Sequence, residues 1–204
     1  MKKIIVDILM FFLLLLEFSR VYLPSFIHET IGFLLIVLVV IHLIFNKNYL
    51  KKLFVGKYNV SRIIMLIINI LFFISLILNL IFGILSSQDL FRFLNVGSLI
   101  IIKLHKIFAY ISLLCLGLHL GINCSPLLKK ICKKINNENI INVLIIIIAC
   151  LGVYFFIDLD IFSHLIGKYG FSSFDGNILL NIFKYLIVVV SISLITDIIY
   201  KKIK

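Results

Sequence analysis

Four histidines within long apolar segments are the residues of this chain best suited to chemistry. His28 and His42 are 14 residues apart, and His105 and His119 are also 14 residues apart. At about 100° per helical residue, a step of 14 ends about 40° short of four full turns. Each pair therefore lies on nearly one face of its helix, about 21 Å apart along the axis.

The two histidine pairs predict a di-haem centre. The two helices are separated by one span and so run parallel, which brings His28 to the level of His105 and His42 to the level of His119. Haem iron with two protein ligands takes one imidazole from each face of the ring, so two facing helices are needed for each haem. No C-x-x-C-H sequence is present for covalent attachment, so the expected cofactors are two non-covalent b-type haems.

Other uses of these histidines stay open. A histidine inside a membrane can simply hydrogen-bond a neighbouring helix. However, ionisable residues at such depths are costly and are by default functional. Zinc or copper fits less well, because such sites take three or four clustered ligands and each level here offers two histidines.

The composition decides the kind of element that must position these residues. The 204 residues are 63% hydrophobic and only 14% charged, with a mean hydropathy of +1.23. A soluble domain has about 45–50% apolar and about 25% charged residues. A globule of this size could not bury so much apolar surface, so the chain is expected to be an integral membrane protein.

The expected fold is all-α, with six transmembrane helices. Lipid-exposed backbone must satisfy its own hydrogen bonds, so apolar blocks of about 20 residues are helices. The predicted spans are 4–23, 27–46, 62–85, 99–122, 139–157 and 178–200. Residues 1–125 are predicted to form a four-helix, cytochrome b-like haem-binding domain, on which two further helices in 126–204 pack.

The positions of the basic residues predict orientation and argue against nucleic acid as a partner of this chain, whose net charge is +11. Fourteen of the 20 basic residues fall on one side of the six-helix path, which places both termini in the cytoplasm. Anionic lipid headgroups are the expected partner of these charges. The residues on this side are Lys2, Lys3, Lys47, Lys51, Lys52, Lys57, Arg62, Lys129, Lys130, Lys133, Lys134, Lys201, Lys202 and Lys204.

Small and basic residues near the histidines extend the candidate site. Gly32 and Gly117 are expected to leave room for a flat macrocycle, although helix packing through small residues explains them equally well. Arg92 and Lys106 are expected to pair with haem propionates, with snorkelling to the interface as the alternative for Lys106.

Further polar residues have simpler interpretations. Glu17 and Arg20 are three apart and could neutralise each other, whereas Glu29 could orient a histidine. His164 is expected to be a solvated loop residue. The four cysteines, none of them in a C-x-x-C pair, are expected to be reduced thiols.

The pattern resembles cytochrome b and, more closely, the small bacterial family described as flavinylation-associated cytochrome, formerly a domain of unknown function. The likeness covers about residues 4–123 and is looser beyond them. The matching stretches are Asp7–Met10, His28–Glu29 with Gly32, His42–Leu43, Lys51–Arg62, Leu104–His105 with Tyr110, and Leu116–Gly121.

The resemblance implies electron transfer across the bacterial cytoplasmic membrane. Electrons would pass from quinol or a cytoplasmic donor to outward-facing proteins that carry covalent FMN, and the four histidines would be the iron ligands. No flavin-attachment motif is present, so the flavin would be on a partner. Two alternatives remain: a quinol-oxidising or ferric-reducing subunit with a quinone site beside one haem, and a non-haem transporter or scaffold. The latter would have Gly or Pro breaks near mid-membrane.

Overall fold

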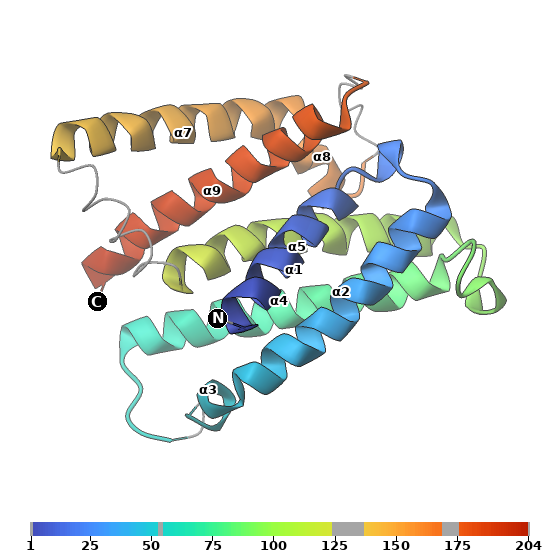
Figure 1. Ribbon diagram of the computed structural model, residues 1–204, viewed down its shortest axis with the longest axis horizontal. Coiled ribbons are helices and arrows are strands. Elements are labelled where there is room, and N and C mark those ends of the chain that lie inside the picture. Colours follow the sequence, from blue (N-terminus) through green and yellow to red (C-terminus); the bar gives the residue numbers. More distant parts are fainter. Residues whose placement is uncertain (1, 53–54, 124–136, 169–175, 204) are drawn as a thin grey trace.

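The computed structural model describes residues 2–52, 55–123, 137–168 and 176–203, and the regular structure in these residues is entirely helical (Figure 1). The long helices are α1 Lys2–Glu17, α2 Ser25–Phe45, α4 Val60–Leu85, α5 Leu99–Asn123, α7 Glu138–Asp158 and α9 Ile178–Ile203. The connections contain α3 Lys47–Lys52, α8 Ile161–Leu165 and the 3-10 turns η1 Arg20–Tyr22 and η2 Arg92–Leu94. Two of the four cysteines, Cys124 and Cys132, lie outside the described ranges, as do five of the basic residues named above: Lys129, Lys130, Lys133, Lys134 and Lys204.

Five helices of the described chain are long and apolar enough to cross a membrane, and they coincide with five of the predicted spans. These are α2, α4, α5, α7 and α9. Large apolar side chains point outward along them, as at Ile146, which is 62% exposed. Such exposure is expected where lipid and not water surrounds a helix, so the fold is consistent with a multi-pass membrane protein.

The segment predicted as the first span, 4–23, forms a shorter helix. α1 has 16 residues and ends at Glu17, and the chain then turns through η1. The Ser19 amide donates back to the Leu16 carbonyl at 2.9 Å, and Pro24 stands immediately before α2. A proline disfavours helical conformation in the residue before it, so the helix cannot run on to residue 23 and into α2.

The helices form antiparallel pairs whose chain ends meet at one end of the molecule. α1 pairs with α2, α4 with α5, and α7 with α9 (Figure 1). Near the termini, Lys3 Nζ lies 3.5 Å from Asn46 Oδ1, and Ser61 Oγ donates to the Ile203 carbonyl at 3.3 Å. We call this the terminal end of the bundle and the other the opposite end.

α5 and α9 form the centre of the fold. The buried cluster joins Leu15 of α1, Leu113 of α5, Leu159 and Val188. The cluster therefore joins residues from both sides of residue 125, the predicted domain boundary. α7 and α9 pack on the first four long helices through α5. At the opposite end a buried ion pair links α9 to α7, with Lys184 Nζ 2.7 Å from Asp158 Oδ2.

Glycines allow the closest helix approaches. A Cβ added at Gly121 would lie 2.6 Å from the Ser193 carbonyl oxygen, and one at Gly152 would lie 2.0 Å from Ser191 Oγ. Both glycines therefore face α9 at contacts that a side chain would open. Small residues of this kind are how membrane helices gain packing energy.

We predict that Gly121→Ala destabilises the protein by about 1–3 kcal/mol, because the new methyl group meets backbone and α9 must shift. Thermal unfolding in detergent measures the effect. Gly32→Ala is the matched control, since its nearest atom, Glu17 Oε2, is 3.7 Å away. Equal thermal midpoints for the two variants would contradict the packing.

Candidate functional site

The four candidate histidines lie on two helices, α2 and α5, each of which is the second helix of an antiparallel hairpin. His28 and His105 are near the opposite end, and their ring centroids are 6.2 Å apart with the rings nearly perpendicular. The structure thus brings one predicted pair together. His42 and His119 are nearer the terminal end, and His42 with its neighbour Asp7 lies within electrostatic range of His119.

At the opposite end each histidine is held through Nδ1 by the helix before it. His28 Nδ1 lies 2.9 Å from Glu17 Oε2 of α1, and these side chains are 18% and 17% exposed. His105 Nδ1 donates to the Asn79 carbonyl of α4 at 2.9 Å. Gly83, one turn further along α4, leaves room for the His105 ring, because a Cβ there would lie 3.0 Å from Cε1.

At the terminal end the same arrangement recurs. His42 Nδ1 donates to Asp7 Oδ1 at 2.7 Å, and His119 Nδ1 donates to Asn69 Oδ1 at 2.8 Å. The Asn46 amide nitrogen also lies 3.3 Å from His42 Nε2. That side chain must turn away if Nε2 is to bind a metal.

The hairpins α1–α2 and α4–α5 therefore share one pattern. The acceptor side chains of Asp7 and Glu17 are ten residues apart in α1. In α4 the acceptors are the side chain of Asn69 and, ten residues later, the backbone carbonyl of Asn79. In each hairpin the later acceptor meets the earlier histidine, as antiparallel pairing requires. The sequence shows the spacing of Asp7 and Glu17, but not that a backbone carbonyl serves as an acceptor in α4. Each acceptor is matched to its histidine only once the helices are paired.

The His28 and His105 imidazoles have a spacing that would suit two ligands of one haem iron. With Nδ1 donating to an acceptor, Nε2 carries the lone pair that binds iron, and such outer partners fix ring orientation in metal sites. Two metal–nitrogen bonds of about 2 Å each, plus the distance from nitrogen to ring centre, put the centroids of two opposed imidazoles about 6 Å apart. His28 and His105 have this separation. No group of three or more His, Cys, Asp or Glu side chains able to hold a metal ion occurs in the described residues.

One expectation about acidic residues is confirmed in part and one is wrong. Glu17 contacts His28 and has Arg20 within electrostatic range. The Arg20 guanidinium donates to the Leu23 carbonyl and to Ser25 Oγ. Glu29 does not orient a histidine. It accepts hydrogen bonds from Ser87 Oγ at 2.7 Å and from three backbone amides of residues 88–90. It thereby holds the α4–α5 connection against α2, because a free carboxylate is the strongest acceptor available to such a loop.

The remaining candidate residues differ in surroundings. Gly32 faces Glu17, beside the His28 pair. A Cβ at Gly117 would lie 2.7 Å from Ile192 of α9, so the structure places this glycine at a helix contact. Arg92 is exposed in η2, and Lys106 is exposed on α5 directly after His105.

His164 is not the solvated loop residue that the sequence predicts. It lies in α8, and its ring stacks on Tyr110 at 4.4 Å between centroids and 6° between planes. Its Nε2 is buried without a hydrogen-bond partner in the described residues. Burial lowers the pKa of His164 from its usual 6.5, and the nearby Lys106 ammonium lowers it further, while Asp160 opposes both.

Comparison of the chain with protein-family models, with curated proteins and with solved structures finds no match in any of the three.

We predict that His164 makes stability depend on pH. Its folded-state pKa is lowered, so the stability it contributes is complete above the unfolded pKa near 6.5 and is lost as the pH falls through the folded-state value. The comparison is between wild type and His164→Phe, which keeps an aromatic ring against Tyr110. Thermal midpoints measured from pH 7.5 to 5 should fall more steeply for wild type. Parallel profiles would contradict the prediction.

Proposed function

We propose that the protein is a di-haem b-type membrane cytochrome that transfers electrons across the bilayer. The observation that carries this proposal is the arrangement of the four histidines. Each offers Nε2 while Nδ1 faces an acceptor on the neighbouring helix, and the His28 and His105 rings have the spacing of an axial pair.

In this proposal the chain's own residues position and tune the cofactors. His28 and His105 would hold one haem and His42 and His119 the other, and the haems would supply one-electron chemistry when bound. Glu17 and Asp7 place a carboxylate behind one imidazole of each pair, and Asn79 and Asn69 place a neutral oxygen behind the other. Arg92 and Lys106 supply positive charge near the haem of the opposite end.

The charge distribution supports the proposed orientation, and the family resemblance supplies the proposed direction of transfer. The terminal end faces the cytoplasm of a bacterial cell, because the basic segments gather there. At about 1.5 Å per residue, α1 is about 24 Å long, and with η1 it serves as the sixth crossing. Electrons from quinol or a cytoplasmic donor would then leave at the opposite end, to an outward-facing protein that carries covalent FMN, as the family resemblance implies.

One observation bears on the transporter alternative. Transporters of that kind use discontinuous helices near mid-membrane. The five span-length helices of the described chain are each continuous, and Pro24, the one proline within the described residues, precedes α2. Continuous helices favour a fixed scaffold that holds cofactors over a transporter whose helices move.

We predict that replacing any one of His28, His42, His105 or His119 by Ala removes about one of two haems. Each haem would lose an axial ligand that no neighbouring group replaces. The measurement is haem extracted and counted per chain, with a reduced-minus-oxidised visible spectrum. His164→Ala is the control and should keep both haems.

Full haem content in all four variants would overturn the assignment, as would a colourless wild-type protein purified after expression with haem supplied. In that case the histidines would be structural. Folding of each variant is followed by its thermal midpoint, so that loss of haem is distinguished from loss of the bundle.

We also predict that Glu17→Gln keeps both haems and raises the midpoint potential of one. The carboxylate behind His28 increases the electron density on the imidazole and so stabilises ferric iron. The expected shift is on the order of 60 mV, which corresponds to a tenfold change in relative stability for one electron. Redox titration measures it, with Glu29→Gln as the matched control at the same end. Equal shifts in both variants would mean that the contact between Glu17 and His28 is not the cause.

A further inference from the structure

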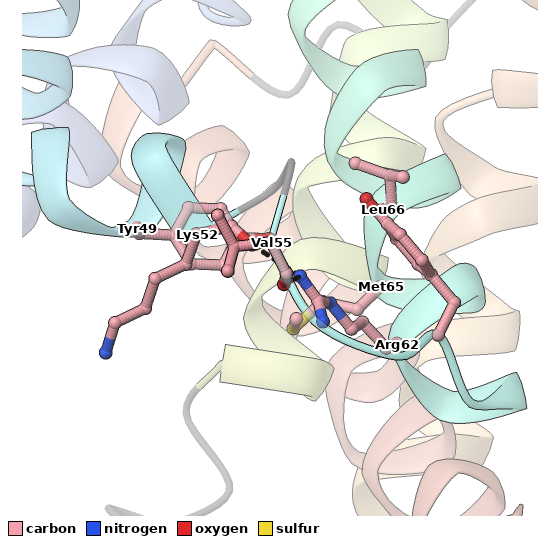
Figure 2. A pocket seen from close by; sticks show the side chains of 7 residues that line it. Tyr49, Lys52, Val55, Arg62, Met65 and Leu66 are labelled. Atoms are coloured by element: carbon pink, nitrogen blue, oxygen red, sulfur yellow. Dashed lines mark hydrogen bonds between the residues drawn. The ribbon is translucent and has the colours of Figure 1, made fainter.

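A cavity of about 300 Å³ opens at the terminal end, between α3, the described residues 55–59 and the first turns of α4 (Figure 2). Its volume is at the lower end of the range for small-molecule sites, about 300–1,000 Å³. The lining residues are Tyr49, Lys52, Val55, Tyr58, Arg62, Met65 and Leu66.

The cavity wall is mostly aromatic and aliphatic, and its most prominent charge is already engaged. The Arg62 guanidinium donates to the backbone carbonyls of Lys52, Val55 and Lys57. It also lies over the Tyr58 ring, 4.4 Å from the centroid. These contacts use three of the five guanidinium N–H donors, so Arg62 holds the wall in shape.

Tyr49 connects the cavity to the candidate haem ligand His119. Its hydroxyl oxygen accepts a hydrogen bond from Asn69 Nδ2 at 2.7 Å, and Oδ1 of the same amide accepts from His119 Nδ1 at 2.8 Å. The Tyr49 hydroxyl retains its own proton, which it can donate to a molecule in the cavity. One amide side chain thus separates the cavity wall from the imidazole.

The lining selects a flat, apolar ring that bears hydrogen-bonding oxygens. Aromatic and aliphatic walls bind such a ring, and one placed hydroxyl orients its oxygen. We propose that this cavity binds the head group of a membrane quinol and is where electrons enter. This inference rests on the proposed haem function.

The step balances with the two proposed haems as oxidants. Oxidation of one quinol breaks two O–H bonds and gives one quinone, two electrons and two protons. The two electrons would pass to two ferric haems, one each, and the two protons would pass to water at the terminal end. Tyr49 would hold the quinol oxygen beside the relay through Asn69 to His119.

The test compares cavity variants with a tyrosine variant far from the site. Tyr49→Phe keeps the ring and removes the hydroxyl, and Leu66→Trp fills the cavity while it leaves the Tyr49–Asn69 contact in place. Tyr154→Phe, on an exposed face of α7, is the control. Each protein is assayed in nanodiscs for haem content, for dithionite reduction, for the rate of haem reduction by menadiol, and for menadione binding by calorimetry.

We expect all three variants to keep two haems that dithionite reduces fully. Tyr49→Phe should weaken menadione binding and slow reduction by menadiol about tenfold, the effect of one lost hydrogen bond. Leu66→Trp should abolish binding, and Tyr154→Phe should match wild type.

Two results would overturn the inference, and they are distinguishable. If wild type holds two haems but all variants bind menadione and accept electrons from menadiol as it does, the cavity is not the quinol site while the haem function stands. If wild type holds no haem, the proposed function fails, and the electron-entry site fails with it.

Discussion

Each of the four helix-borne histidines lies against an acceptor on the preceding helix of its own hairpin, and this contact constrains everything else in the site. A histidine in an apolar helix needs a partner for its ring N–H, since an unpaired polar group is costly away from water. Glu17, Asp7, Asn79 and Asn69 supply that partner. The contacts fix the register of α1 against α2 and of α4 against α5, and they turn each imidazole so that Nε2 is the atom left for a ligand.

The two hairpins use this device with different chemistry. α1 offers carboxylates and α4 offers neutral oxygens, so each candidate histidine pair combines one strongly and one weakly polarised imidazole. In the proposed cytochrome this makes the first hairpin the one that lowers haem potentials. The second hairpin instead connects to its surroundings, because Asn69 also reaches Tyr49 at the wall of the terminal-end cavity. In the proposed cytochrome, α1 would tune the haem potentials, and α4 would connect His119 to the terminal-end cavity.

The remaining helices hold the second hairpin in place. α5 carries two histidines on one side and Gly117 and Gly121 on another, where α9 approaches closely. α9 is fixed in turn to α7 through Gly152 and through the ion pair of Lys184 with Asp158. Glu29 closes the opposite end by capping the α4–α5 connection, so a residue next to His28 constrains the chain that leads to His105.

The sequence alone determined five apolar helices of span length, which are consistent with a multi-pass membrane protein, and the two histidine spacings, because hydropathy and helical periodicity act locally along the chain. It did not determine that α1 ends at Glu17, which depends on the turn formed by Ser19 and Pro24. Nearness in the sequence also predicted that Glu17 pairs with Arg20 and that Glu29 orients a histidine. The tertiary structure assigned Glu17 to His28 and Glu29 to the 87–90 backbone, and it moved His164 from solvent onto Tyr110. These contacts join residues that are distant in the chain or lie across a turn, so their partners are set by helix register and crossing, which no local pattern encodes.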